Sequence, residues 1–283
     1  MEKSSERLEI LSKIDEYERN EWWTRDVEDD PETIPLTLDK ADYFHKKIST
    51  RFLIKFANFL GRIFINYLIR HRALIIKEVR GLKENYLPLE KQGAIITCNH
   101  FNQFDNFAVY KALEGHIKKN ELYKIIREGN YTNFPGFFGF LFHYANTIPL
   151  SGNFTCMKEM MKAVSYYLNR GEKILVYAEQ AMWWNYRKPR PLTPGAFRFA
   201  AENNVPVIPV FITMEDSELT GQDGFPVQEY TVHMLPAIFP DEKKSARENS
   251  AEMKEKNYSL WKKTYEDFYG MPLTYLKAGT ADS

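Results

Sequence analysis

The 283-residue chain has only two cysteines, which is too few for a framework of disulfide bonds and suits a reducing compartment. It has no excess of either charge, because 38 lysines and arginines balance 38 aspartates and glutamates. This balance gives no reason to expect a nucleic-acid partner. The charged N-terminal segment lacks the apolar core of a signal peptide, and no uncharged apolar run reaches the roughly 18 residues of a membrane-spanning helix. We therefore expect neither secretion nor a simple transmembrane helix.

Common catalytic signatures are also missing. The chain contains no phosphate-binding G-x-x-x-x-G-K-[ST] loop, no G-x-G-x-x-G, no H-E-x-x-H and no G-x-S-x-G. Its six histidines are scattered, so their spacing predicts no metal site. Cys98 and His100 would share one face of a strand, but we interpret Cys98 as a small buried strand residue rather than a nucleophile. What remains is a globular composition, 44% hydrophobic and 15% aromatic.

Residues 51–70, RFLIKFANFLGRIFINYLIR, are the most unusual stretch of the chain. On a helix, the polar residues recur every three or four positions and form one narrow stripe, whose charges are all basic. Such a helix is typical of a segment that lies in an anionic membrane surface. A membrane span is less favoured because Lys55 and Arg62 would sit at membrane depth. The alternative is a helix packed on the protein body with its basic edge in solvent. This polar, basic edge of the helix consists of Arg51, Lys55, Asn58, Arg62, Asn66 and Arg70.

The rest of the chain alternates between apolar strand patterns and amphipathic helices. Strands are predicted at 73–79, 93–99, 121–127, 146–150, 173–179, 205–213 and 229–235. Helices are predicted at 4–19, 105–117, 153–171, 194–204 and 245–268, with a short aromatic helix or turn at 134–144. This alternation predicts an α/β fold with a mixed, largely parallel sheet flanked by helices. We expect residues 1–72 to form an N-terminal amphipathic helical extension and residues 73–283 to form the α/β domain, which ends in a helix.

One short motif combines chemistry with an informative position. In CNHFNQFDNF, residues 98–107, Asp105 follows His100 by five positions, where a strand is expected to give way to a helix. Across such a turn the two side chains can converge, whereas a continuous helix would set them about 140° apart. Active sites of α/β sheets also gather at the carboxyl ends of strands. We predict that His100 is a general base, that Asp105 orients its ring, and that Asp105 caps the following helix. The alternative is an ordinary polar turn.

This motif resembles the N-H-x-x-x-x-D block of the glycerolipid acyltransferases, typified by 1-acylglycerol-3-phosphate acyltransferase. Four further segments between about residues 77 and 214 resemble other blocks of that family in the same order. They are EVRGLKENYLP, YKIIREGNYTNFPGFFGFLFHYANTIPL, ILVYAEQ and TPGAFRFAAENNVPVIPV. The resemblance implies that His100 and Asp105 are catalytic. The substrate-binding positions that it implies are Asn99, Arg127, Glu179 and Gly195.

Two departures from the family pattern concern the phosphate of the acceptor. Leu150 stands where the family usually has Arg, and residues 180–182, Gln-Ala-Met, replace its Gly-Thr-Arg. Four cations could rebuild an anion site by another route, and a solvated basic loop is the alternative. These cations are Arg127, Arg187, Lys188 and Arg190.

The resemblance implies transfer of a fatty acyl group from an acyl thioester, carried by coenzyme A or acyl carrier protein, to a hydroxyl of a lysophospholipid or related acceptor. It implies no cofactor, no metal ion and no acyl-enzyme. We expect a peripheral protein on the cytoplasmic face of the cell membrane, acting in phospholipid synthesis. Trp183 and Trp184 would line the acyl path, lie at the membrane interface or pack in the core.

A protein of another class remains the alternative: a catalytically inactive lipid-binding or scaffolding protein that keeps the fold. The missing Gly-Thr-Arg favours this alternative. The intact His100 and Asp105 oppose it, because a buried charged pair is costly to retain without use.

Overall fold

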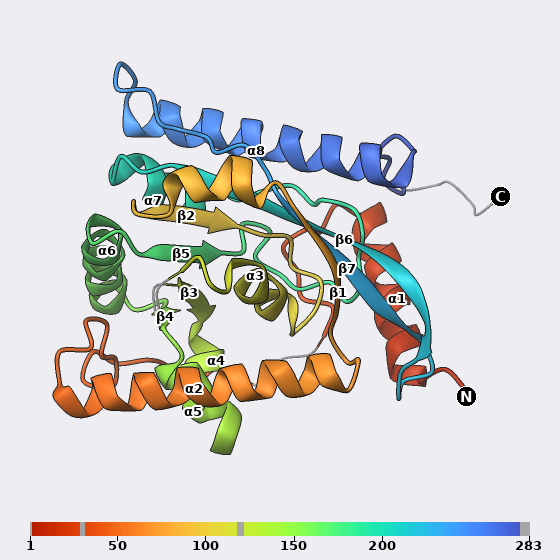
Figure 1. The fold of residues 1–283 in the computed structure, drawn as a ribbon, viewed down its shortest axis with the longest axis horizontal. Helices are drawn as coiled ribbons and strands as arrows, with labels where there is room; N and C mark the ends of the chain where they lie inside the picture. Colours follow the sequence, from red (N-terminus) through yellow and green to blue (C-terminus); the bar gives the residue numbers. More distant parts are fainter. Residues whose placement is uncertain (1, 29–31, 118–121, 278–283) are drawn as a thin grey trace.

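The computed structural model describes residues 2–28, 32–117 and 122–277. Its strands are β1 (Ile75–Arg80), β2 (Ala94–Thr97), β3 (Leu122–Arg127), β4 (Thr147–Leu150), β5 (Lys173–Val176), β6 (Val207–Thr220) and β7 (Pro226–Met234). They form one sheet in the order β1-β7-β6-β2-β5-β3-β4 (Figure 1). Strands β6 and β7 pair antiparallel, and the other neighbouring pairs are parallel. The predicted mixed, largely parallel α/β sheet is confirmed.

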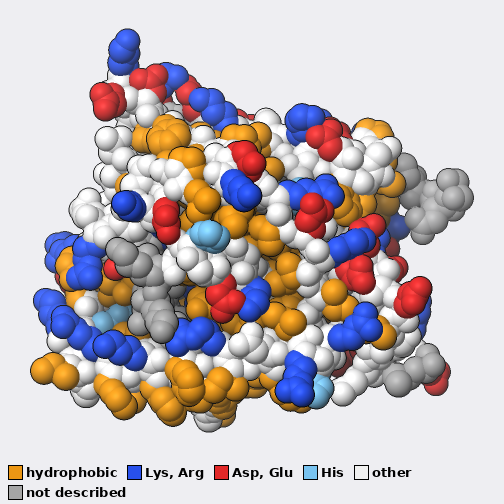
Figure 2. Space-filling model, viewed as in Figure 1, with side chains coloured by type: hydrophobic (Ala, Val, Ile, Leu, Met, Phe, Trp, Pro, Cys, Tyr) orange, Lys and Arg blue, Asp and Glu red, His pale blue; other side chains and the backbone are white. Residues whose placement is uncertain are grey.

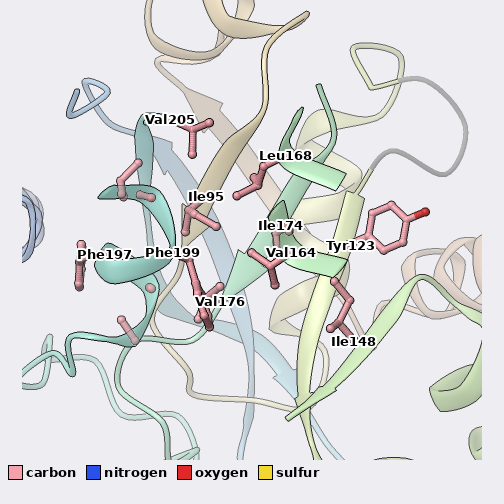
Figure 3. Packing of buried hydrophobic residues seen from close by; sticks show 14 of the residues in the cluster. Ile95, Tyr123, Ile148, Val164, Leu168, Ile174, Val176, Phe197, Phe199 and Val205 are labelled. Carbon is pink, nitrogen blue, oxygen red and sulfur yellow. The ribbon is translucent and has the colours of Figure 1, made fainter. Parts of the chain in front are cut away.

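Helices cover both faces of this sheet, because its central strands are apolar on both sides. The side chains of β2 alternate between two buried clusters. Ile95 joins the cluster under three helices, and Figure 3 shows it near Ile174 and Val164. Ala94 and Ile96 join the cluster on the opposite face, under two other helices. The first three helices are α6 (Phe154–Asn169), α7 (Gly195–Glu202) and α8 (Ala246–Tyr269), and the other two are α2 (Ile48–Arg70) and α3 (Asp105–Leu113).

The differences from the expected element bounds lie mainly at the ends of the strands. β2 stops at Thr97 and β5 at Val176, earlier than predicted, and the residues that follow leave the sheet as loops. β6 continues to Thr220 and makes a long hairpin with β7. A turn of π-helix at Leu82–Tyr86 and the short helix α4 (Glu128–Thr132) were not expected. The early strand ends matter for function, because the loops after β2 and β5 carry the site described below.

The N-terminal helix α1 (Ser5–Arg19) packs onto the α/β body. Its Ile10 and Ile14 share a buried cluster with Trp183 and Trp184. The indole Nε1 of Trp183 donates a hydrogen bond to the carbonyl oxygen of Arg25 at 2.8 Å. Trp183 has no exposed surface and Trp184 is 7% exposed, so both tryptophans pack in a core. Of the three roles considered for this pair, the structure supports core packing.

Helix α2 runs along one side of the body, with α5 (Gly136–Tyr144) beside it (Figure 1). By length and composition it is apolar enough to cross a membrane. One face, which includes Ile54, Ala57 and Leu68, is buried against the protein. A second face is exposed and apolar, and we call it the α2 stripe. The α2 stripe consists of Ile48, Phe52, Phe56, Phe59, Ile63 and Tyr67.

Candidate active site

His100 and Asp105 meet at the turn between β2 and α3. The Nδ1 atom of His100 lies 2.7 Å from the Oδ2 atom of Asp105. The Asp105 side chain is fully buried, while 21% of the His100 side chain is exposed. The turn therefore places a buried carboxylate behind an imidazole that solvent and ligands can reach.

The Asp105 carboxylate also fixes the shape of the turn. Its Oδ2 atom accepts hydrogen bonds from the backbone N–H groups of Phe101 at 3.2 Å and Asn102 at 3.4 Å. The prediction that Asp105 caps α3 is wrong, because Phe104 occupies the cap position and Asp105 is the first residue of the helix. The carboxylate is directed back toward the turn, where His100 and two N–H groups offer it donors.

An ionised Asp105 selects one tautomer of the His100 ring. The nitrogen that faces the carboxylate, Nδ1, carries the proton, and Nε2 is left with a free lone pair. No hydrogen bond within the described part of the chain occupies Nε2. This is the arrangement that a general base requires, because the lone pair is available and the ring is held from behind.

Tyr177, which the sequence analysis did not select, completes the surroundings of this pair. Its ring stacks on the imidazole of His100, with centroids 3.9 Å apart and planes inclined by 16°. Its hydroxyl donates a hydrogen bond to the Oδ1 atom of Asp105. Burial, and then the negative charge of Asp105, raise the pKa of Tyr177 well above its usual value. The sequence signal that could have found it is its place directly after β5, the strand that pairs with β2.

Glu179 and Arg190 form a buried ion pair under the turn that carries His100. The Glu179 carboxylate accepts hydrogen bonds from the backbone N–H groups of His100 at 3.0 Å and Arg190 at 2.8 Å. The Arg190 guanidinium lies 3.0 Å from Glu179 Oε2 and donates to the carbonyl oxygens of Trp23, His100 and Ala181. Both side chains are almost completely buried. The structure thus gives this pair a supporting role that ties the loop after β5 to the backbone of His100.

Asn99 and Gly195, which were also predicted to bind substrate, lie in different surroundings. The side-chain amide of Asn99 bridges to β6, since its Oδ1 accepts from Ile212 N at 2.8 Å and its Nδ2 donates to Ile212 O at 3.0 Å. Asn99 is buried, so it anchors the turn to the neighbouring strand. Gly195 opens α7 and is exposed, and a side chain placed there would meet no atom within 4 Å. A role of either residue in substrate binding stays a prediction.

The remaining cations are each paired with a carboxylate of the protein. Arg187 lies 2.5 Å from Asp216, and Lys188 lies 2.6 Å from the buried Glu18 of α1. Arg127, at the end of β3, pairs with Asp26. These pairs neutralise much of the positive charge that was expected to hold an acceptor phosphate. Their role in an anion site stays a prediction, and it would require a ligand that competes with these carboxylates.

A cavity of about 300 Å³ lies where β3 and β4 end. Arg127 and Leu150, which are partners in the register of these two parallel strands, both contribute to its wall. Glu128, Asn130 and Phe134 line it as well. The cavity therefore brings together two positions that the sequence analysis connected with the acceptor.

Cys98 is fully buried, and burial raises the pKa of its thiol well above the usual value, which disfavours the nucleophilic thiolate. Its interpretation as a buried residue is confirmed. Among the described residues, no group of three or more His, Cys, Asp or Glu side chains is placed to hold a metal ion.

Comparisons with known proteins find a family pattern in the sequence and a similar fold. The sequence model described as Acyltransferase matches residues 78–213, which include the turn, Tyr177, Glu179 and Arg190. No curated protein sequence matches the chain. Among solved structures, the fold is similar to that of the 1-acyl-sn-glycerophosphate acyltransferase PlsC from Thermotoga maritima. That similarity has a TM-score of 0.51 at 15% identity and covers 78% of this chain and 82% of the other. Residues 78–213 therefore carry the sequence pattern of an acyltransferase domain, on a fold similar to that of PlsC.

Proposed function

We propose that the protein transfers a fatty acyl group from an acyl thioester of coenzyme A or acyl carrier protein to a hydroxyl of a lysophospholipid-type acceptor. The observation that carries this proposal is the 2.7 Å contact between His100 Nδ1 and the buried Asp105, which leaves Nε2 as the basic atom. The Thermotoga protein with the similar fold is named for acylation of 1-acyl-sn-glycerophosphate. For the present chain, that acceptor is one candidate within the class.

The reaction follows from the state of the imidazole. Nε2 of His100 takes the proton of the acceptor hydroxyl while the hydroxyl oxygen attacks the thioester carbonyl carbon. The resulting tetrahedral intermediate collapses, the carbon–sulfur bond breaks, and the imidazolium returns its proton to the leaving thiolate. The products are an ester and a free thiol, and the enzyme is regenerated without a covalent intermediate. Asp105 stabilises the positive charge that the ring carries between the two proton transfers.

We propose that the acceptor headgroup enters the cavity between the ends of β3 and β4. Arg127 supplies a cation there when the headgroup displaces its partner Asp26, and Phe134 and Leu150 supply apolar wall. The polar head of a lysolipid needs the cation, and the beginning of its acyl chain suits the apolar wall.

We further propose that the protein lies on the membrane surface through α2 and α5. The α2 stripe continues onto Phe137 and Phe138 of α5, which are 43% and 49% exposed. The ring centroid of each lies 5.9 Å from the ring centroid of Phe64 on α2. Figure 2 shows hydrophobic side chains along the edge where α2 runs, with lysines and arginines next to them. An apolar face bordered by cations suits an anionic bilayer, from which a lysolipid acceptor would be drawn.

The deciding experiment measures thiol release by the purified full-length chain. Acyl-coenzyme A and acyl carrier protein thioesters are each combined with lysophosphatidic acid, other lysophospholipids and monoacylglycerol, and products are identified by mass spectrometry. We expect an acceptor-dependent release of thiol with formation of one additional ester. If no combination exceeds the His100→Ala variant while the protein still binds lipid vesicles, the inactive lipid-binding alternative replaces the proposal.

A further inference from the structure

Tyr177 contacts both members of the proposed catalytic pair, and no family motif used above assigns it a role. Its backbone directly follows Val176, which is the register partner of Thr97 at the end of β2. The ring therefore projects beside the turn that follows Thr97. It stacks on His100 with centroids 3.9 Å apart, while its hydroxyl bonds to Asp105 Oδ1.

The hydrogen bonds of Asp105 show what the hydroxyl contributes. The Oδ2 atom accepts from His100 and from the N–H groups of Phe101 and Asn102. The Oδ1 atom accepts from Tyr177. Because Asp105 is fully buried, loss of this donor would leave Oδ1 with weaker support, and the negative charge of the carboxylate would then be compensated mainly by the donors on Oδ2, His100 among them.

We propose that Tyr177 is a positioning residue for the acyl transfer. Its hydroxyl holds the Asp105 carboxylate in one orientation, and its ring fixes the plane of the His100 imidazole so that Nε2 faces the acceptor. This inference rests on the proposed function for its catalytic meaning, but the contacts it invokes exist independently of that function.

The hydroxyl remains a donor whenever His100 titrates. Burial and the charge of Asp105 raise the pKa of Tyr177, so the phenol stays protonated throughout the range where an imidazole changes charge. The Tyr177 hydroxyl therefore never places a second negative charge next to Asp105.

Other titratable groups near the pair do not compete with this role. Cys98 and Tyr230 both have pKa values raised by burial, with the Asp105 charge as a second cause, so both are neutral. Glu179 and Arg190 carry opposite charges 3.0 Å apart and act on the His100 backbone rather than on its ring. The charge that governs the His100 ring is that of Asp105.

Replacement of Tyr177 by Phe removes the hydroxyl and keeps the stacked ring. The negative charge of Asp105 then loses a competing donor and acts more strongly on the His100 imidazolium, so the pKa of His100 rises by about half a unit or more. The orientation of the carboxylate is also less fixed, and we expect kcat to fall about five- to tenfold. KM changes little, because the hydroxyl bonds to the protein and not to the substrate.

The first measurement is the titration of His100 in the full-length chain by NMR, with its signal assigned by comparison with His100→Gln. The matched control is Tyr43→Phe, which removes another buried hydroxyl, one that donates to Pro149 O at 3.2 Å on the other face of the sheet. We expect the His100 titration and the acidic limb of kcat/KM to move to higher pH in Tyr177→Phe and to stay in place in Tyr43→Phe. An unchanged His100 titration in Tyr177→Phe, or the same shift in both variants, would overturn the proposal.

A second variant, Tyr177→Leu, also removes the stacked ring. We expect a further fall in kcat with the same rise in the His100 pKa, since the ring orients the imidazole without changing the charge next to it. A Leu variant as active as the Phe variant would contradict the role of the ring. If the wild-type chain transferred no acyl group at all, the proposed function would fail, whereas the NMR titration would still decide whether Tyr177 controls Asp105 and His100.

Discussion

Both oxygens of Asp105 accept hydrogen bonds, although the residue has no contact with solvent. Hydrogen bonds to the charged form are what keep a buried carboxylate ionised. In the proposed mechanism His100 needs an ionised partner, because its proton must stay on Nδ1 for Nε2 to act as a base. The hydrogen bonds around Asp105 therefore fix the carboxylate that the His100 ring faces.

The first prediction concerns this pair. His100→Ala removes the base and should abolish acyl transfer with little loss of stability, because the ring lies at a partly exposed turn. Asp105→Asn should reduce the rate about a hundredfold or more, since an amide does not favour the required tautomer. Thiol release and thermal unfolding of both variants test this. Near-normal turnover of His100→Ala would show that the mechanism is wrong.

The second prediction concerns acid stability. His233 on β7 is buried and bonded to Thr213 Oγ1 at 2.9 Å, and burial, assisted by Arg80, lowers its pKa to about 4. The unfolded chain binds a proton on this residue near pH 6.5, so the native state is fully favoured above that value and loses stability as the pH falls toward 4. The loss at pH 5 is at most about 2 kcal/mol.

Urea unfolding at pH 7 and pH 5 measures this effect. His233→Gln keeps a polar partner for Thr213 but cannot gain a proton, so its stability should fall less between the two pH values. The lowered pKa of His45, also a result of burial, acts in both proteins and cancels in the comparison. An identical pH dependence of stability in the two proteins would show that His233 does not cause the loss of stability at pH 5.

At the scale of the element, α2 has two apolar faces and one basic edge. The buried face packs on the sheet and α3, and the α2 stripe has no protein cover within the described part of the chain. The stripe is a continuous apolar surface on one helix, extended by phenylalanines of α5, which is more than the scattered apolar side chains of an ordinary surface.

The third prediction follows from this exposure. Phe59→Asp should weaken binding to vesicles that contain phosphatidylglycerol, because a charge enters the apolar face. Phe59 is 51% exposed, so the fold should survive. The matched control is Phe239→Asp, at a side chain that is 56% exposed and lies outside α2 and α5.

Vesicle sedimentation at low and high salt measures the effect. Salt should weaken binding of the wild-type chain in part, since Arg51 and Lys55 each contribute about 1 kcal/mol near the surface and the apolar face is insensitive to salt. Equal loss of binding in both Asp variants, or no loss in Phe59→Asp, would place the membrane contact elsewhere.

At the scale of the whole molecule, the N-terminal segment is part of the body. Helix α1 covers Trp183 and Trp184, Trp23 accepts a hydrogen bond from Arg190, and Glu18 pairs with Lys188. These contacts connect the first residues of the chain to the loop that supports His100. The N-terminal helix is consequently coupled to the turn of His100 and Asp105 through packing and ion pairs.

The fourth prediction tests that coupling. Ile10→Ala and Ile14→Ala should each reduce stability by about 2–4 kcal/mol, because they open a cavity against the tryptophan cluster. Leu8→Ala, at an exposed position of the same helix, is the matched control and should change little. Thermal unfolding followed by tryptophan fluorescence measures the difference. Equal stability of all three variants would show that α1 is not part of the cooperative unit.

Sequence alone predicted the α/β fold class and the place of His100 and Asp105 because both depend on local information. Strand and helix periodicities repeat over a few residues, and a pair that spans one turn is constrained by that turn. The predicted element bounds failed at the ends of β2 and β5, where pairing with distant strands decides the last sheet residue.

Tertiary structure decided what depends on contacts between distant residues. Tyr177 reaches Asp105, and Arg190 reaches Glu179, only after β5 is placed beside β2 and the loop after β5 folds back over the turn. The same holds for α2, whose periodicity shows which residues share a face. It does not show which of the two apolar faces meets the protein, because hydrophobicity alone does not separate them and only packing against the body does.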